Sequence, residues 1–599
     1  FIAVRLLGGA AYWPYGVERL TALASERKIP LALLPGGQEF DPDLVGRSRL
    51  DATAVERLRA YLAQGGSENA AHFLRFAASL IGQDVEPPPP QSFPTAGLYW
   101  PGLGQPSLAD VLAQWPQACP VAAITFYRAL IEGGLTAPVD ALVNALIERG
   151  LNPLPIFVSS LKDAVSAALL TESLAAAPPA IILNATGFAV SAGSGSKTSN
   201  PLRASDCPVL QVVFSGSSED AWRADSQGLG PRDLAMNVVL PELDGRIMTR
   251  AVSFKADRER HEPTECRIVT YRPVPDRIDF VADFAVNWVR LRRTPAARRR
   301  VAIVLANYPN RDGHIGNGVG YDTPASTLAI LRALAGAGYD VEGIPASGNG
   351  IIEALQTGPT NAAQRPGGAI LPLTDYMRFF AQLPDTTKDA IGKRWGDPDR
   401  DPYVRDGAFR LPVKHYGSVI TAIQPARGYN IDPKETYHDP ALPPPHGYLA
   451  FYLWLRERFR AHAVIHNGKH GNLEWLPGKA NGLSTACFPE AALGPLPQLY
   501  PFIVNDPGEG AQAKRRTSAV IVDHLTPPLT RAETYGPLRE LEALIDEYYL
   551  ASGVDRRRLI ALKSRILDLT RSSGLDLDAG MAEAADEQAA LQKLDTYLC

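Results

Sequence analysis

The sequence has few cysteines and little net charge, and each shortage excludes a class of protein. Its five cysteines among 599 residues stand far apart, and no C-x-x-C pair is present that could hold zinc or cycle as a disulfide. Dispersed thiols are typical of a reducing compartment, so we expect a cytoplasmic protein. The formal net charge of -4 gives no global positive field, so we expect neither nucleic acid nor a membrane as a partner.

Long apolar runs and common catalytic motifs are also missing. No run of 18 apolar residues predicts a transmembrane helix. The P-loop pattern is absent, because Gly478-Lys479 is followed by Ala480 and Leu473 stands where the first glycine would be needed. We therefore expect no ATP hydrolysis by a P-loop mechanism. No G-x-S-x-G elbow is present, so a nucleophilic triad is not indicated.

The length and the hydrophobic pattern predict several α/β domains. A chain of 599 residues is too long for one hydrophobic core, and short apolar runs alternate with helical patterns. This alternation predicts a multidomain α/β fold of parallel-sheet units with helices on both faces. We expect an incomplete N-terminal α/β segment at 1–90, an α/β domain at 91–295 and a second α/β unit at 296–375. A loop-rich active-site region at 376–530 and a helical C-terminal segment at 531–599 should follow.

Particular elements follow from the same pattern. We expect strands at 121–126, 154–158, 180–183, 208–214, 301–306 and 339–341, and helices at 138–149 and 323–337. Between the two α/β units lies an arginine cluster at 290–300, which we interpret as a solvated linker face in preference to a phosphate or partner patch. The chain begins without Met and ends within a helical pattern, so we expect an internal fragment of a longer protein.

Histidines are concentrated in one part of the chain. Of the ten histidines, six lie between residues 415 and 470: His415, His438, His446, His462, His466 and His470. The densest part places His466, His470 and Glu474 at steps of four after a short apolar run. Imidazoles and a carboxylate are ligands that a borderline divalent metal prefers, so the pattern predicts an open, transient metal site. The alternative is a hydrogen-bonded structural pair of histidines.

A glycine-rich loop at 307–324 lies between a predicted strand and a predicted helix. It contains Asn310, Arg311 and Asp312, and its four later glycines permit close backbone approach to a ligand. In an open α/β sheet this position is the carboxyl edge, where ligands bind. A phosphate loop is one interpretation, although the dinucleotide fingerprint is absent. Other polar loop positions beside glycine or proline are Asn184, Glu242 and residues 505–516. For each of them the two interpretations are a turn residue and a functional site.

Three strings together resemble a known family. They are N-Y-P-N-R-D-G-x-I-G-N-G-V-G-x-D-T-P at 307–324, H-x-G-x-H-G-x-L-E-W-L-P-G-K at 466–479 and I-V-D-H-L-T-P-P-L-T-R-A at 521–532. They are similar to the large-subunit family of the aerobic cobaltochelatase, and more distantly to that of magnesium chelatase. The resemblance spans roughly residues 120–599.

The resemblance implies insertion of Co(II) into hydrogenobyrinic acid a,c-diamide in cobalamin biosynthesis. In this family a separate AAA+ subunit, acting with an integrin-I-domain-like partner, uses Mg(II) and hydrolyses ATP, while the large subunit holds the tetrapyrrole. Residue chemistry and the resemblance together assign His466, His470 and Glu474 to the metal, with Glu474 or Glu242 as base. We expect the tetrapyrrole to be bound by cations and polar groups: Lys479, Lys514, Arg515, Arg516, Asn310, Arg311, Asp312 and Asn184.

Two other functions stay open at this point. One is a magnesium-chelatase-type large subunit, against which histidine ligation argues because Mg(II) favours oxygen ligands. The other is a tetrapyrrole carrier or scaffold without chemistry. The missing nucleotide motif favours that interpretation, and the clustered His and Glu oppose it.

Overall fold

The computed structural model describes most of the chain in two compact units, Phe1–His524 and Leu525–Cys599. In the first unit the described residues are 1–37, 40–116, 119–191, 200–307, 312, 315–316, 321–429, 439–468, 471–503 and 507–524. In the second unit they are 540–541, 543–545, 547–548, 556–572 and 590. None of the helices in these ranges is both long and apolar enough to span a bilayer.

The N-terminal residues form a small α/β layer. Strands β1 (Ile2–Leu6) and β2 (Leu31–Pro35) pair in parallel, and the four helices around them are α1 (Pro14–Arg27), α2 (Pro42–Arg47), α3 (Ala52–Gln64) and α4 (Ser67–Ser79). Asp51 caps α3 by accepting a hydrogen bond from the Ala54 amide, as expected for Asp at a helix start. The buried face of α3, with Val55, Leu58 and Tyr61, packs on β2.

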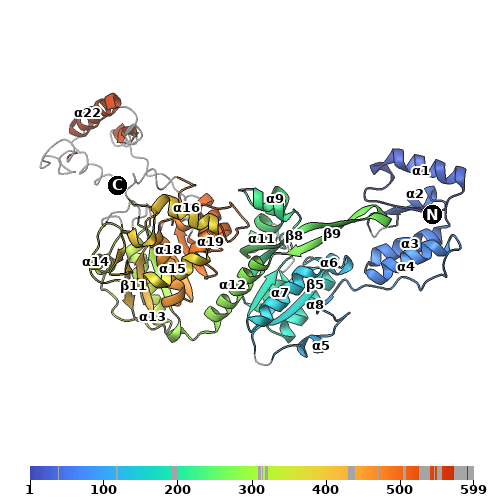
Figure 1. Ribbon diagram of the computed structural model, residues 1–599, viewed down its shortest axis with the longest axis horizontal. Helices are drawn as coiled ribbons and strands as arrows, with labels where there is room; N and C mark the ends of the chain where they lie inside the picture. The colour runs from blue at the N-terminus through green and yellow to red at the C-terminus, as the bar shows by residue number, and fades with distance from the viewer. Residues whose placement is uncertain are drawn as a thin grey trace. The chain divides into compact units, whose positions relative to one another are not determined.

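A seven-stranded sheet follows, in the order β3-β5-β4-β6-β7-β8-β9. Its strands β5, β8 and β9 are labelled in Figure 1. Its strands are β3 (Ala96–Leu98), β4 (Val121–Tyr127), β5 (Asn152–Val158), β6 (Ile181–Asn184), β7 (Val209–Ser215), β8 (Ile247–His261) and β9 (Cys266–Pro273). Strands β5, β4, β6, β7 and β8 run parallel, and β3 and β9 join the edges antiparallel. This confirms the parallel α/β fold that the sequence predicts.

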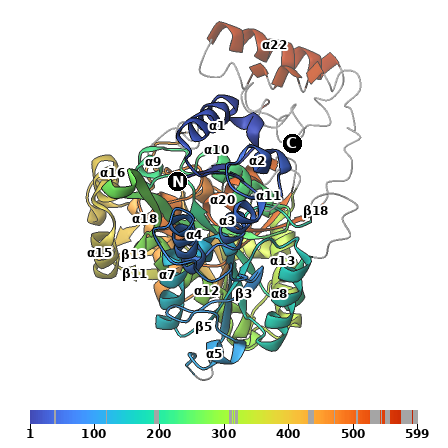
Figure 2. The same cartoon turned by 90° about the vertical axis from the view of Figure 1, so that its right-hand side faces the viewer.

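Helices cover both faces of this first sheet. In Figure 2, α7 (Ala137–Glu148) and α8 (Ala164–Ala176) lie on opposite sides of the strands. Right-handed crossovers require this arrangement, because the chain moves from β4 to β5 in one direction and returns past β4 to β6 in the other. Helix α12 (Pro275–Arg293) packs beside α7 and buries Val281, Phe284 and Trp288.

A second sheet has the order β14-β15-β10-β16-β17-β18. Its strands are β10 (Val301–Leu305), β14 (Val413–Tyr416), β15 (Val419–Ile423), β16 (Ala463–Asn467), β17 (Gln498–Ile503) and β18 (Val520–His524). All neighbours are parallel except β14 and β15. Alternate residues of β10 point to opposite faces. Ile303 packs with residues of α13 (Thr323–Gly336) and α14 (Gly348–Gln356), while Val304 packs with those of α18 (His446–Leu453).

The remaining elements surround the second sheet. Strands β11 (Ala369–Pro372), β12 (Val404–Arg405) and β13 (Ala408–Leu411) form a small antiparallel sheet. The helices of this region are α13 (Thr323–Gly336), α14 (Gly348–Gln356), α15 (Leu373–Gln382), α16 (Asp385–Trp395), α18 (His446–Leu453), α19 (Phe488–Leu493) and α20 (Pro507–Arg516). In the second unit, α22 (Arg556–Ser572) packs with Leu541 and Leu544.

Two features differ from the sequence-based expectation. The second sheet joins β10 to strands from residues 413–524, so it crosses the boundary that we expected at 375. Residues 339–341, expected as a strand, lie in no strand. They follow the glycine that ends α13, and their apolar side chains pack on the second sheet from outside it. A short apolar run can thus cap a sheet face without entering the sheet.

The arginine cluster lies where α12 leads into β10. Arg292, Arg293 and Arg298 are exposed, as expected for a linker face. Arg290 instead donates a hydrogen bond to the Ala461 carbonyl at 2.7 Å, and Arg299 donates to the Tyr339 hydroxyl at 2.8 Å. Part of the cluster therefore stabilises the connection between α12 and β10 by hydrogen bonds, while the rest faces solvent.

Buried polar contacts join the first sheet to the second. Glu490 of α19 is 7% exposed and pairs with Arg250 of β8 at 2.7 Å and with Arg277 of α12 at 2.6 Å. Burial opposes ionisation of Glu490, but the two guanidiniums outweigh it and lower the pKa of this carboxyl. Nearby, the Trp222 indole donates to the Gly482 carbonyl at 2.7 Å.

We expect Glu490→Gln to destabilise the protein strongly, because it leaves the buried Arg250 guanidinium without its counter-charge and leaves Arg277 with only the more exposed Asp276. The loss should be about 3–5 kcal/mol in urea denaturation followed by tryptophan fluorescence. Because the folded pKa of Glu490 is lowered, this contribution is present above the unfolded pKa and disappears as pH falls through the folded pKa. As a control, Glu219→Gln breaks an exposed pair with Arg223 and should cost less than about 1 kcal/mol. Equal effects would contradict the prediction.

Candidate functional site

The candidate site lies at the carboxyl edge of the second sheet. Strands β10, β15, β16, β17 and β18 run parallel, so their carboxyl ends meet at one edge. The glycine-rich loop follows β10, and His466 is the penultimate residue of β16. Asn310, Arg311 and His470 lie outside the described residues.

His466 is buried between two tyrosine rings. It is 3% exposed, and its ring stacks with Tyr452 at 6.5 Å and with Tyr500 at 5.9 Å between centroids. Its Nε2 atom lies 3.0 Å from the Tyr452 hydroxyl. Burial lowers the pKa of His466 to about 3, so the imidazole is neutral at neutral pH. A neutral imidazole is the form that binds a metal ion.

A relay of hydrogen bonds links the loop after β16 to Glu474. The Gly471 amide donates to the Tyr500 hydroxyl, and this hydroxyl donates to Glu474 Oε1 at 2.8 Å. Glu474 is fully buried. Burial and the neighbouring Glu474 raise the pKa of Tyr500 well above its usual value, so the phenol keeps its proton and remains a donor. Tyr500 therefore connects the two candidate metal ligands, stacking on one and donating to the other.

Gly471 is required by the space around His466. A Cβ atom at this position would lie 2.7 Å from His466 Nδ1 and 3.0 Å from Gln424 Nε2. Contacts below 3.0 Å essentially never occur for a real Cβ, so any side chain here would push the imidazole aside. The loop glycine thus allows the backbone to approach the Nδ1 edge of His466.

Asn472 adds a further hydrogen bond to the same loop. Its side-chain oxygen accepts from the Tyr448 hydroxyl at 2.7 Å, and its amide donates to the Pro425 carbonyl at 3.1 Å. The loop between His466 and Glu474 is therefore bound to α18 on one side and to the end of β15 on the other.

Arg516 holds the segment that follows. Its guanidinium donates to the carbonyls of Glu474, Leu476 at 2.7 Å and Lys479 at 3.0 Å. The residue is 6% exposed, and burial lowers the pKa of Arg516. These bonds fix residues 474–479 from the end of α20. We expected this guanidinium to bind the tetrapyrrole, but in the structure it binds the protein's own backbone.

The other expected cations also contact protein groups. Arg515 pairs with both carboxylate oxygens of Glu242, at 3.0 and 2.9 Å. Lys479 donates to the carbonyls of Arg223 at 3.1 Å and Asp225 at 2.6 Å. Lys514 is partly exposed and makes no ion pair with the described residues. Glu242 and Arg515 thus come from the first and second sheet regions and meet as a half-buried pair.

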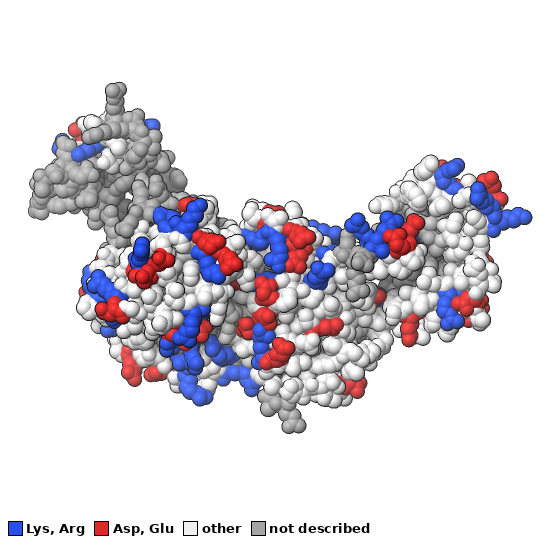
Figure 3. All heavy atoms as spheres, in the orientation of Figure 1, with Lys and Arg blue, Asp and Glu red and all other residues white. Residues whose placement is uncertain are grey.

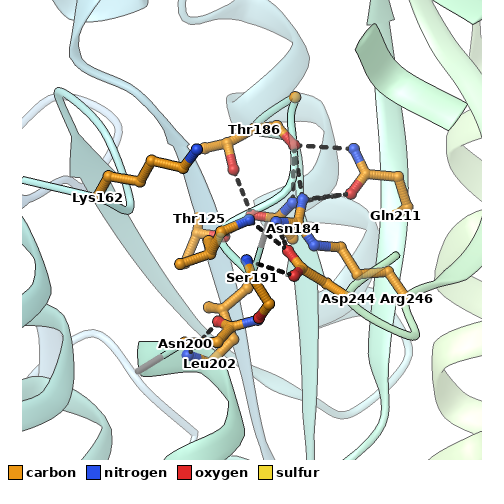
Figure 4. Close-up of polar contacts among 12 residues, drawn as sticks. Thr125, Lys162, Asn184, Thr186, Ser191, Asn200, Leu202, Gln211, Asp244 and Arg246 are labelled. Carbon is orange, nitrogen blue, oxygen red and sulfur yellow. Dashed lines mark hydrogen bonds and ion pairs between the residues drawn. The ribbon is translucent and has the colours of Figure 1, made fainter. Parts of the chain in front are cut away.

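Asn184 lies at the end of β6 in the first sheet, in a buried network (Figure 4). Its side-chain oxygen accepts from Thr125 at 2.7 Å, and its amide donates to Gln211 at 2.9 Å. Arg246 donates to the same Gln211 oxygen at 3.0 Å and to Asp244 at 2.8 Å. Since Asn184 is fully buried in this network, it shapes the loop after β6.

Asp312 of the glycine-rich loop is held by residues before β11. Thr360 donates to one carboxylate oxygen at 2.6 Å, and Arg365 donates to the other at 2.7 Å. Partial burial opposes ionisation, but these two donors outweigh it and lower the pKa of Asp312. Asp312 is thus a charged anchor for its loop.

The other described histidines of the sequence cluster do not join His466. His446 lies in the core beside Tyr376, 2.7 Å from its hydroxyl. The ring of His415 packs edge-on against Trp454 and Phe459. At the opposite end of β16, His462 Nδ1 accepts from the Arg300 amide at 2.9 Å.

Among the described residues, no group of three or more His, Cys, Asp and Glu side chains could hold a metal ion. His466 and Glu474 are linked through Tyr500, and His470 belongs to the part of the loop that is not described. The predicted ligand set of His466, His470 and Glu474 therefore stays a prediction.

Comparison with known proteins identifies the family. A family model described as CobN/Magnesium Chelatase matches residues 59–599. The chain belongs to this family. It is 54% identical over its whole length to an aerobic cobaltochelatase subunit CobN from Sinorhizobium sp. and 50% identical to the one from Pseudomonas aeruginosa, covering 48% of each. The chain thus spans about half the length of these curated relatives.

A solved structure supports the same family. The catalytic subunit of cobaltochelatase from Mycobacterium tuberculosis matches 99% of this chain and 50% of its own length, with a TM-score of 0.73 and 36% sequence identity. The sequence resemblance to the CobN/magnesium chelatase family is therefore confirmed.

Three aromatic residues of the site in this CobN/magnesium chelatase chain were not expected from the sequence. Tyr448 and Tyr452 lie on a helix that is apolar on all sides, so their pattern is that of core residues. Tyr500 lies in a strand with no motif around it. Only the pairing of β16 with β17 and the packing of α18 bring these rings to the histidine.

We expect His466 to remain neutral down to about pH 4, because burial between tyrosines lowers its pKa to about 3. Selectively labelled histidine NMR checks this, with the His466→Gln protein identifying the signal. The unfolded state binds the proton near pH 6.5, so this residue makes folding less favourable as pH falls below that value. A His466 signal titrating near pH 6 would contradict the burial argument.

Proposed function

We propose that this chain forms the metal-inserting part of an aerobic cobaltochelatase large subunit. It would place Co(II) in hydrogenobyrinic acid a,c-diamide, with ATP and Mg(II) used by an AAA+ subunit and its integrin-I-domain-like partner. The observation that carries the proposal is the neutral, buried His466 joined through Tyr500 to the buried Glu474 at the carboxyl edge of the second sheet. Whole-chain identity to CobN subunits supports the same metal and substrate.

In this proposal, metal insertion needs a ligand set that holds the ion only briefly. Imidazole nitrogen binds Co(II) without first losing a proton, because His466 is already neutral. His470 would add a second nitrogen and Glu474 an oxygen. A ligand set that includes few anions leaves the ion able to move to the four nitrogens of the macrocycle.

Insertion also releases the protons of the ring nitrogens, so the site needs an acceptor. Glu474 is the candidate, because a positioned carboxylate can act as a general base. The hydrogen bond from the Tyr500 hydroxyl fixes the position of this carboxylate. Glu242 is the weaker candidate, since Arg515 occupies both of its carboxylate oxygens. Among the expected anchoring cations in the described part of the chain, Arg515 pairs with Glu242, and Lys479 and Arg516 donate to backbone carbonyls. Lys514, which is partly exposed, is therefore the preferred anchor in this proposal.

A magnesium-chelatase-type activity is the second candidate, because the family contains both enzymes. The ligand chemistry favours cobalt, because Mg(II) prefers oxygen ligands whereas His466 offers a buried imidazole nitrogen. A carrier without chemistry is the third candidate and would bind the macrocycle without a metal site of its own.

We expect Glu474→Gln and His470→Ala to reduce cobalt insertion at least about 100-fold while tetrapyrrole binding is largely kept, because both changes remove the chemical group and not the surrounding fold. The measurement is chelatase turnover with the full-length subunit and its ATPase partners. His415→Gln, which changes a ring packed outside the site, is the control and should leave turnover unchanged.

Other outcomes separate the candidates. Near-normal turnover of both variants would remove these residues from the mechanism. Insertion of Mg(II) in preference to Co(II) by the unmodified protein would favour the second candidate. Tetrapyrrole binding with no turnover and no Co(II) affinity would favour a carrier.

A further inference from the structure

The topology of the first sheet creates a crevice far along the chain from His466. The order β5-β4-β6-β7-β8 means that the chain first moves from β4 to one side and then returns to build the other. Strands β4 and β6 are neighbours, and the connections leave them in opposite directions. Open α/β sheets bind ligands at this kind of switch point, outside the carboxyl ends of the strands.

A cavity of about 490 Å³ opens at this switch point. It lies at the ends of β4, β6 and β7, next to Tyr127, Ala185 and Phe214. Leu130, Met236 and Tyr271 complete walls that are mostly apolar and aromatic. A volume of this size and an apolar lining with a few polar groups are typical of sites for ring-containing small molecules.

The protein's own carboxylate already occupies the anion position of the loop after β7. Asp233, which is 7% exposed, accepts from Ser215 Oγ at 2.7 Å and from the Gly216 amide at 3.1 Å. The Asn237 side chain donates to its other oxygen at 3.1 Å. In many α/β proteins the amides of such a loop hold a ligand phosphate. Because Asp233 takes these donors here, the cavity is poorly suited to a phosphate.

Two cations instead stand at the rim of the cavity. Lys255 and Arg232 both line it, both are exposed, and neither forms an ion pair with the described residues. The Lys255 amine lies 6.0 Å from the centre of the Tyr271 ring. Burial raises the pKa of Tyr271, and the positive charge of Arg232 acts against this rise. Both cations therefore lie close enough to the Tyr271 ring to interact with it. A ligand with a ring in the cavity would place its acidic groups at this rim.

The backbone beside the cavity has two uncommon conformations. Met236 and Asn237 belong to a π-helical segment, η3 (Leu234–Val239), a rare form that is frequent at functional sites. The Phe188 amide donates to the Met236 carbonyl at 2.8 Å, while Phe188 has φ 62° and a side chain 46% exposed. An exposed aromatic residue held in a left-handed conformation is unfavourable without a compensating contact. The two uncommon segments meet at the cavity wall through the Met236 carbonyl.

We propose that this cavity is a second ligand site, which takes a planar ring compound bearing carboxylates, with the ring against Tyr127, Phe214 and Tyr271 and the carboxylates at Lys255 and Arg232. The assignment does not depend on the metal-insertion role of His466 and Glu474, because it rests on a different sheet and different side chains. A carboxylated macrocycle has this chemistry, and so do smaller aromatic acids.

The test uses the whole protein without metal or ATP and three probes: a tetracarboxylate porphyrin, its methyl ester and flavin mononucleotide. Hydrogen–deuterium exchange of residues 126–131 and 230–237 reports binding at this cavity, and fluorescence quenching gives the affinity. We expect the porphyrin acid to protect these residues, and the double variant Arg232→Gln/Lys255→Gln to weaken its binding about tenfold or more. The ester and the flavin phosphate should bind less tightly than the acid.

Two control proteins make the result specific. Arg260→Gln removes an exposed cation farther along β8 and should leave protection and affinity unchanged. Glu474→Gln should also leave protection of 126–131 and 230–237 unchanged, whatever it does to chelatase turnover. Unaltered affinity in the double variant, tighter binding of the flavin phosphate, or protection confined to peptides near His466 would each overturn the second site.

Discussion

The paired contacts of Glu490 are the constraint on which the arrangement of this chain depends. One carboxylate satisfies Arg250 of the first sheet and Arg277 of the following helix, all three nearly removed from water. A buried ion triad is weak evidence for net stability, but losing one member is expensive because the others stay charged. The interaction therefore enforces one pairing between α19 and the first sheet. Helix α19 packs against the short helical turn Leu473–Trp475 that contains Glu474, so the triad also restrains the candidate site.

Around that site, apolar and aromatic packing determines the chemistry of polar groups. The stacked rings of Tyr452 and Tyr500 exclude water from His466, and this exclusion keeps the imidazole unprotonated. The same burial keeps the Tyr500 phenol protonated, so it can donate to Glu474. One dehydrated environment thus prepares a nitrogen donor and orients a carboxylate, without a charged partner between them.

Sequence reasoning predicted the elements well where one local signal dominated. Apolar runs such as Val301–Leu305 became buried parallel strands, and the helical pattern expected at 138–149 became α7. It failed where contacts between segments far apart in the sequence determine the position of a side chain. The histidine cluster suggested convergence, but His462 immediately precedes β16 and His466 lies near its far end, so the strand separates them. Nor could any spacing show that Arg516 binds backbone carbonyls, because that depends on how α20 packs.

The carboxyl edges of the two sheets differ, which is why we propose a different kind of ligand for each. In the first sheet, Asp233 fills the loop's anion position and the Asn184 network closes the strand end, so the open space is apolar and its charges lie at the rim. In the second, the described donors at the strand end are an imidazole and a carboxylate within a few residues of glycines. An apolar crevice suits a ring, whereas nitrogen and oxygen donors suit a metal ion. The proposed function brings a macrocycle and a metal ion together and therefore needs both kinds of surface. Rigid contacts such as the Glu490 triad hold the two sheets that carry these surfaces in one arrangement.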